Sequence, residues 1–526
     1  MKKVWIGLLA FAWSGWVSAQ STDKQTVEKY ANTITKDDLK KHLSIIASDE
    51  YEGRETGEKG QKMAAKYIAT HFQNIALEGP VKDNKNAYYQ PFELVKSSWG
   101  DCYIKSKGGK LELLKDFVPY GNFEIAKSKM EVVFAGFGIE HENYSDYKDL
   151  DVNGKLVVVI EGEPQSEDGK YVVSGSDKKS KEGNLLEKMK LAKAKGAASI
   201  VVAYQEDDKF SKMLGQFSRR LEKPSMGFDK GKEGKENTFG LFLTSLSNAA
   251  VALNTSKENL ETGLQEMNTG KSIAGKFNGK VKIKAERSVS PVISENVLGY
   301  MEGTDKKDEI LVITSHYDHI GVDPNGDINN GADDDGSGTV GLLEIAEAFS
   351  KAKAEGKGPR RSILFMTVSG EEKGLLGSDF YSRNPVFPLK NTITDLNIDM
   401  IGRVDAEHKD EPNYVYIIGS DMLSSELHNL HEEAAKTYYP DFKLDYKYNS
   451  EDDPNRFYYR SDHYNFAKHN IPVIFYFNGT HEDYHKPTDT VDKIEFESLR
   501  NRARLVFVTA WELANRENRP KVDKNQ

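Results

Sequence analysis

Histidines and carboxylates follow four short apolar runs in the C-terminal half of the sequence. The runs cover 310–314, 362–368, 395–400 and 471–477, and the polar residues at or after their ends are His316, Asp318, Glu371, Glu372, Asp399 and His485. If the runs are neighbouring strands of an open α/β sheet, these side chains converge at the edge formed by the carboxyl ends of the strands. A further acidic group, Asp333, Asp334 and Asp335, lies in GADDDGSG, where glycines permit a tight turn before a predicted helix over 337–353.

The number of candidate ligands favours two metal ions over one. A single catalytic zinc takes three protein ligands and keeps one position open, so two histidines and three carboxylates are too many for it. Two ions that share one carboxylate could each take a histidine, a second carboxylate and a bridging water, from which hydroxide would form near neutral pH. Imidazole and carboxylate ligands without thiolate suit zinc best, with cobalt and manganese as alternatives. Spacing alone does not decide which of the three consecutive aspartates would bridge.

The adjacent acids Glu371 and Glu372 point in different directions from a loop, so Glu372 can bind metal while Glu371 acts as general base. Asp318 lies two residues beyond His316, and we expect its carboxylate to hold the second nitrogen of that imidazole. The ordinary alternative is that these acids are solvated or cap helices. We expect Asp333 or Asp335 to cap the helix over 337–353. His319 and His463 are expected to be hydrogen-bonded scaffold residues.

These stretches resemble the co-catalytic dinuclear-zinc aminopeptidases, the bacterial leucyl aminopeptidase type of metallo-exopeptidase. The similar stretches are SHYDHIG from Ser315, GADDDGSG from Gly331, SGEEKGLLGS from Ser369, NIDMIGR from Asn397, YHKPTDT from Tyr484 and YEGRETGEKG from Tyr51. The resemblance implies two Zn²⁺ ions held by His316, Asp334 as the bridge, Glu372, Asp399 and His485, with Glu371 as the base. It also implies that Tyr484 hydrogen-bonds the tetrahedral intermediate and that Arg460 reaches a substrate carbonyl or oxyanion.

The order of strands and helices predicts an α/β fold, a doubly wound mixed sheet of the zinc exopeptidase type. Between about 130 and 285, strands rich in β-branched residues surround one clear helix over 186–195, which predicts parallel pairing of 155–160 with 199–202. The lysines of that helix, Lys188, Lys190, Lys193 and Lys195, predict a solvated face. This segment has no histidine–carboxylate cluster, so we interpret it as an inserted, mostly β accessory domain. DVNGKLVVVIEG from Asp151 resembles a protease-associated domain.

The predicted division of the chain has five parts. Residues 1–19 are a predicted signal peptide, with Lys2 and Lys3, an apolar run and a small-residue cleavage site, although an uncleaved anchor is an alternative. Residues 20–125 and 290–515 are the two parts of the peptidase domain, 126–289 is the insert, and 516–526 is a polar, frayed tail. No other stretch reaches 18 apolar residues, so no membrane span is expected after removal of the signal.

Composition limits the partners and the redox chemistry. The 526 residues include 72 Lys and Arg against 82 Asp and Glu, a net charge of −10, which argues against nucleic acid as a partner. Cys102 is the only cysteine, so no internal disulfide can form, and we expect it to be buried.

We therefore predict an exported, periplasmic or extracellular zinc metallo-aminopeptidase that removes N-terminal residues from peptides through a hydroxide bound by two zinc ions. Three alternatives stay open. A carboxypeptidase-like enzyme would need a cation for the terminal carboxylate, which Arg403 or Arg460 could supply. A glutaminyl-cyclase-like enzyme would use one zinc, and a binding module would use none. The preferred N-terminal residue and the oligomeric state do not follow from the sequence.

Overall fold

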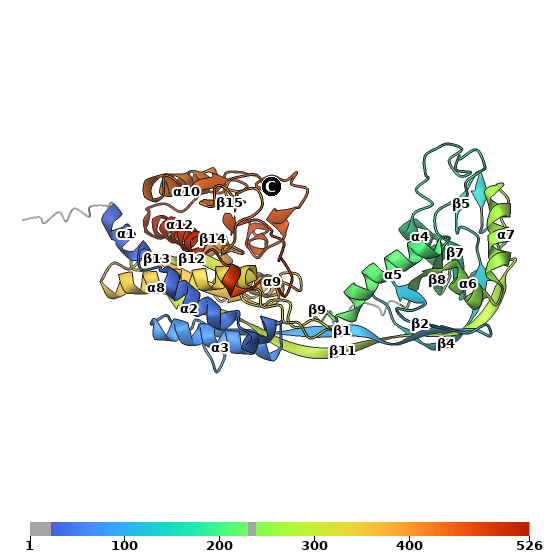
Figure 1. Ribbon diagram of the computed structural model, residues 1–526, viewed down its shortest axis with the longest axis horizontal. Coiled ribbons are helices and arrows are strands. Elements are labelled where there is room, and N and C mark those ends of the chain that lie inside the picture. The colour runs from blue at the N-terminus through green and yellow to red at the C-terminus, as the bar shows by residue number, and fades with distance from the viewer. Residues whose placement is uncertain (1–22, 230–237, 525–526) are drawn as a thin grey trace, which may run out of the picture. The chain divides into compact units, whose positions relative to one another are not determined.

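The computed structural model describes residues 23–229 and 238–524, which form two compact units (Figure 1). The first unit contains the described residues up to Phe92 together with those from Ile293 onward, and the second unit contains Glu93–Val292. The chain passes between them along two long strands, β1 (Tyr89–Lys105) and β11 (Asn278–Met301). The predicted signal peptide lies outside the described residues.

A mixed sheet runs through the first unit, as predicted. From one edge, its order is β16 (Lys443–Asp445), β15 (Tyr414–Ile418), β17 (Val473–Phe477), β14 (Thr392–Ile398), β12 (Lys306–His316), β13 (Arg361–Val368) and β11. The four strands β17, β14, β12 and β13 are mutually parallel, whereas β15 and β11 are antiparallel to their neighbours β17 and β13. The carboxyl ends of the four parallel strands therefore share one edge, and the four strands predicted from the sequence are these four.

Both faces of this sheet are covered, because alternate residues of each strand point into different cores. Leu311 and Ile313 lie in one core, and Ile310 and Val312 lie in the other. Helices that contribute to the first core are α1 (Lys24–Ala31), α2 (Lys36–Ile46), α3 (Lys59–Asn74), α8 (Gly338–Ala354), α10 (Ser425–Tyr438) and α12 (Phe496–Asn515). Those of the second core are α9 (Leu376–Arg383) and α11 (Tyr464–Ala467).

Loops and short turns complete the first unit. Short helical turns cover Asp49–Arg54, Ala332–Ser337, Leu389–Asn391, Phe457–Tyr459 and Val491–Lys493. The segment predicted to be a frayed tail is held in its described part, because Arg361 donates to the carbonyl of Arg516 at 2.6 Å and the N–H of Asp523 donates to the carbonyl of Leu423 at 3.1 Å. Among the described helices, none has the length and apolar content to cross a bilayer.

In the second unit, β11 pairs with β4 (Ile125–Phe134), and the strand order continues with β7 (Leu156–Ile160), β8 (Ser199–Tyr204), β10 (Gly240–Ser245) and β3 (Phe117–Pro119). The predicted parallel pairing of β7 with β8 is confirmed. Shorter strands are β2 (Lys110–Glu112), β5 (Glu140–His141), β6 (Tyr144–Ser145) and β9 (Ser225–Gly227). Cys102, on β1, is buried as expected, and burial raises the pKa of its thiol to about 12.

The second unit contains more helix than the sequence pattern indicated. Its described residues form α4 (Leu185–Ala194), α5 (Asp207–Glu222), α6 (Leu246–Leu253) and α7 (Lys257–Asn268), where one helix was predicted. The predicted solvated face of α4 also needs correction, because Lys188 is buried and its ammonium donates to the carbonyls of Phe137, Ile160 and Gly162. Three backbone acceptors thus replace the water that this charge would otherwise need.

Candidate metal centre

His316 is the last residue of β12, and its buried ring faces two carboxylates. Nε2 lies 3.3 Å from Oδ1 of Asp334 and 3.6 Å from Oδ1 of Asp399. Nδ1 lies 3.1 Å from the backbone carbonyl of Asp318, which accepts a hydrogen bond if Nδ1 carries the proton. That tautomer leaves the lone pair of Nε2 directed at the carboxylates, as in a metal-binding histidine.

The carboxylate of Asp318 is not the closest partner of His316, which differs from the prediction. Its Oδ1 lies 3.8 Å from Nδ1 of His316. Instead, Oδ2 accepts a hydrogen bond from Oγ1 of Thr56 at 2.6 Å, and Oδ1 accepts one from the backbone N–H of Glu371 at 3.3 Å. Asp318 therefore orients the histidine through its backbone, while its side chain positions the loop that carries Glu371.

The two carboxylate oxygens of Asp334 face two different histidines. Oδ1 faces His316, whereas Oδ2 lies 3.0 Å from Nε2 of His485. The two histidines, which are 169 positions apart in the sequence, thus meet at a single carboxylate. A carboxylate that offers one oxygen to each side has the geometry needed to bridge two ions.

The neighbouring aspartates are used differently. Asp335 accepts hydrogen bonds from the backbone N–H groups of Gly338 and Met400, both at 2.9 Å. It therefore caps the start of α8, which was expected of either Asp333 or Asp335. Asp333 accepts from Oγ of Ser337 at 2.9 Å and from the N–H of Gly402 at 2.6 Å. Both carboxylates are thereby engaged with protein donors, which leaves Asp334 as the member of the run that faces the histidines.

Glu371 and Glu372 follow β13 and diverge, as predicted. Glu372 turns toward His485, with Oε2 3.2 Å from Nε2 of that ring. Glu371 turns toward the other side, where its Oε2 lies 3.9 Å from Nε2 of His316. Asp399, directly after β14, completes that side. The structure therefore brings all five predicted metal ligands and the predicted base together at one edge of the sheet.

His319 also lies in this cluster, which the sequence analysis did not anticipate. Its Nδ1 is 2.8 Å from Oε1 of Glu372 and 3.8 Å from Oδ2 of Asp334. Gly331, at φ +55°, makes room for this ring, because a Cβ there would lie 2.5 Å from it. The sequence offered one signal, the second histidine of SHYDHIG. His463, by contrast, is buried and stacked on Phe475, with ring centroids 4.8 Å apart.

Unpartnered buried atoms show that this cluster fits metal. Asp334 Oδ2, Glu372 Oε1 and both ring nitrogens of His319 are buried without a hydrogen-bond partner. Two groups of possible ligand atoms, each within 4.8 Å of one another, share Asp334: one adds His316 and Asp399, and the other adds His319 and Glu372. Buried polar atoms without partners are rare in proteins. Cations placed between them would satisfy all three residues.

The charges of the cluster suit that interpretation. Burial opposes ionisation of Asp334, but the adjacent rings of His316 and His485 outweigh it and hold the pKa of Asp334 well below its usual range. Burial also acts against Glu372, yet His319 and His485 lower its pKa to about 2. Burial raises the pKa of Glu371 well above the usual range. Two acids are thus ionised for metal binding, and the third is tuned toward holding a proton.

A small pocket opens beside the cluster. Its lining includes His316, Asp334, Glu371, Asp399, Tyr484, Arg460 and the aromatic residues Phe457, Phe475 and Phe477. The ring of Tyr484 stacks on that of His485 at 3.9 Å, and Nη2 of Arg460 lies 3.5 Å from the hydroxyl of Tyr484. Arg403 is not part of this lining, since it is buried and paired with Asp483 at 3.1 Å. Tyr484 and Arg460 therefore lie where they could reach a substrate.

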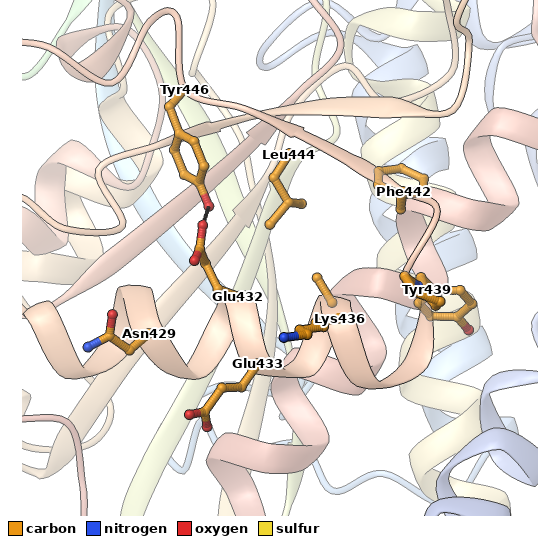
Figure 2. A pocket seen from close by; sticks show the side chains of 10 residues that line it. Asn429, Glu432, Glu433, Lys436, Tyr439, Phe442, Leu444 and Tyr446 are labelled. Atoms are coloured by element: carbon orange, nitrogen blue, oxygen red, sulfur yellow. Dashed lines mark hydrogen bonds between the residues drawn. The ribbon is translucent and has the colours of Figure 1, made fainter.

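A larger pocket lies along α10 (Figure 2). Figure 2 shows Tyr446 and Glu432 on its wall, with Lys436 and Phe442 also in the lining. The hydroxyl of Tyr446 donates a hydrogen bond to Oε1 of Glu432 at 3.1 Å. Its lining contains no histidine and no pair of carboxylates that converge on a further ligand. It therefore lacks the chemistry of the cluster described above.

Comparison with known proteins agrees with the geometry. Residues 296–510 match Peptidase family M28. The chain is 26% identical over 265 residues to Aminopeptidase YwaD of Bacillus subtilis (strain 168). This alignment covers 49% of this chain and 52% of that protein. It is 27% identical over 295 residues to the probable zinc metalloprotease Lema_P086240 of Leptosphaeria maculans, and this alignment covers 47% of this chain and 65% of that protein. The matched region thus spans between half and two thirds of these relatives.

The fold is also shared with a solved structure. An aminopeptidase from Aneurinibacillus sp. strain AM-1 superposes with a TM-score of 0.54 at 18% identity, over 95% of this chain and 97% of that one. At this identity the likeness concerns the fold, an α/β architecture with a large mixed sheet. Residues 296–510, which contain every candidate ligand, are thus the part of the chain that matches Peptidase family M28.

Proposed function

We propose that this protein is an exported aminopeptidase that uses two zinc ions to hydrolyse the N-terminal residue from peptides. The observation that carries the proposal is the carboxylate of Asp334, which turns one oxygen to His316 and the other to His485. The match of residues 296–510 to Peptidase family M28 supports peptide hydrolysis, and the predicted leader at 1–19 supports export. We also retain the proposal that the segment 126–289 is a protease-associated-like insert.

The residues would hold the metals in two sets that share Asp334. His316 and Asp399 would complete one set, and His485 with Glu372 would complete the other. When bound, two zinc ions would polarise the scissile carbonyl and lower the pKa of water so that a nucleophile forms near neutral pH. The buried, ionised state of Asp334 and Glu372 prepares the cluster for positive charge.

Glu371 would move the proton. It lines the pocket without making a close contact to either histidine, so its carboxylate is free to accept a proton from the attacking water and pass it to the leaving amine. A raised pKa suits this role, because the protonated form must persist until the leaving group takes the proton. Tyr484 and Arg460, on the pocket wall, would donate hydrogen bonds to the oxyanion.

The pocket favours a particular end of a peptide. Carboxylates that surround it attract the free α-amine of a substrate, whereas Phe457, Phe475 and Phe477 offer an apolar surface to its first side chain. One observation favours a second candidate, a carboxypeptidase: Arg460 is an exposed cation on the wall, and a terminal carboxylate would need one.

Cleavage of paired substrates tests the proposal. The purified full chain should hydrolyse leucyl and phenylalanyl p-nitroanilides, and N-acetylation of the same substrates should abolish this. A chelator should remove the activity, and added Zn²⁺ should restore it. Cleavage of N-blocked peptides from a free C-terminus would identify the carboxypeptidase instead. Export is tested separately, by cell fractionation and by sequencing the N-terminus of the mature protein, which is expected to begin at Gln20.

A further inference from the structure

Two histidines and two glutamates, none of them part of the candidate metal centre, meet between helices of the first unit. His42 comes from α2, His71 from α3, and Glu344 and Glu347 from α8. Both α2 and α3 contact α8, and Figure 1 shows the three helices in the same layer. Residues three apart on a helix share a face, so both glutamates point toward the same neighbours.

His42, His71 and Glu347 form one close group, and Glu344 joins it through its contact with His42. Nε2 of His42 is 3.3 Å from Oε1 of Glu344, and Nε2 of His71 is 3.9 Å from Oε2 of Glu347. The two rings are 4.8 Å apart and nearly perpendicular, at 86°. Ligand atoms of His42, His71 and Glu347 all lie within 4.8 Å of one another. Bonds of about 2.0–2.1 Å in a tetrahedral site place ligand atoms roughly 3.4 Å apart, so modest side-chain rotations would close the set.

Two of these groups are buried without a partner. Oε1 of Glu344 and Nε2 of His71 have no hydrogen bond, and the side chain of Glu344 is only 2% exposed. Leaving buried polar atoms unpaired costs stability, and native proteins rarely do so. A cation between the rings and the carboxylates would satisfy both atoms. The side chain of Glu347 is 29% exposed, which leaves an approach from solvent.

The surroundings favour the metal-binding form of each ring. Nδ1 of His42 lies 2.7 Å from the hydroxyl of Tyr67, so Nε2 is the nitrogen that faces Glu344. Histidines that bind metal commonly engage their second nitrogen in this way. Burial and the neighbouring His42 lower the pKa of His71 to about 4, so its ring is neutral at pH 7. A neutral imidazole keeps the lone pair that a metal requires.

We propose that His42, His71, Glu344 and Glu347 form a second, structural zinc site that joins α2 and α3 to α8. Four protein ligands and no open position are typical of structural rather than catalytic zinc. Imidazole with carboxylate, in the absence of thiolate, suits zinc. The site would stabilise the helical layer that packs on the sheet without taking part in the chemistry at Asp334.

Zinc content tests this inference. The full chain, its His71→Ala variant and its Glu347→Gln variant are saturated with Zn²⁺, passed through a metal-free gel filtration column and measured by elemental analysis. Each variant should retain about one zinc ion fewer per chain than the wild type, because a four-ligand site holds one ion. Zn²⁺ should also raise the melting temperature of the wild type more than that of either variant.

Matched controls separate the site from other effects. His469→Ala removes an exposed histidine, and Lys351→Gln removes the partner of Glu347 at 2.8 Å while leaving the ligands intact, so both should keep the wild-type zinc content. The loss caused by His71→Ala should persist in an Asp334→Ala background, which makes the result independent of the proposed catalytic function. Equal zinc content in the wild type and both site variants would overturn the inference. If His71→Ala does not fold, the zinc content of the more conservative variant Glu347→Gln tests the inference.

Discussion

Ser461 donates a hydrogen bond to Asp399 that fixes which oxygen of this carboxylate faces His316. Oγ of Ser461 lies 2.6 Å from Oδ2 of Asp399, and the other oxygen, Oδ1, lies 3.6 Å from Nε2 of His316. Asn397 in turn donates to Oγ of Ser461 at 2.8 Å. Because Ser461 is buried, no water can easily replace its hydroxyl. It therefore positions a candidate ligand without being one.

Replacement of Ser461 by alanine should weaken zinc binding on the His316 side. Loss of a hydrogen bond that orients a ligand typically lowers metal affinity by about 10- to 100-fold. Competition with a chromogenic chelator measures this, and Ser450→Ala, which removes an exposed hydroxyl elsewhere, serves as the control. An unchanged affinity in Ser461→Ala would show that Asp399 needs no such support.

Glu371→Ala should keep its zinc and lose at least about a hundredfold in kcat, the contribution expected of a general base. The carboxylate lines the pocket but makes no close ion pair, so its removal leaves the ligand set in place. Elemental analysis and steady-state kinetics on the same preparation separate metal loss from loss of chemistry. Glu433→Ala, which replaces an exposed glutamate of α10, is the matched control. Turnover near that of the wild type would remove Glu371 from the role of base.

The sequence predicted the part of the site that follows from strand order. His316, Glu371, Glu372 and Asp399 each come shortly after an apolar run, and parallel strands must bring their carboxyl ends to one edge. His319 could not be placed in the same way. Its contact with Glu372 depends on how closely Gly331 approaches the ring, and this packing between distant segments leaves no periodic signal.

The second unit shows a similar limit. α6, with the sequence LSNAAVAL, is largely apolar, so periodicity does not distinguish it from a buried strand. Lys188 lies in a helix with two other lysines, and only the fold brings the carbonyls of Phe137, Ile160 and Gly162 around its ammonium. Local patterns thus predict elements that bury one face, whereas they miss residues whose environment is built from distant chain segments.

The two histidines near Glu372 should respond differently to replacement. Nε2 of His485 contacts both Asp334 and Glu372, at 3.0 and 3.2 Å, so His485→Ala should lose about one of the two zinc ions proposed for this centre. His319 has one close contact, to Glu372, so His319→Ala should keep both ions but bind one of them more weakly. Elemental analysis at equal free zinc measures both variants, with His469→Ala as the control. The reverse pattern would make His319 the ligand and His485 the supporting residue.

The free energy of unfolding should fall as the pH drops below about 6.5, and His431 should account for part of this. The ring is fully buried, with Nδ1 3.0 Å from Oγ1 of Thr509, and burial together with His428 lowers its pKa to about 3. In the unfolded chain the pKa returns to about 6.5, so between these values the unfolded state binds the proton and is favoured. At pH 5 the free energy of unfolding should be about 2 kcal/mol lower than at pH 7.5.

Urea unfolding in EDTA, which excludes metal effects, measures this. The free energy of unfolding should fall less between pH 7.5 and pH 5 for His431→Gln than for the wild type or His469→Gln. A pH dependence identical in all three would mean that His431 is already protonated in the folded protein.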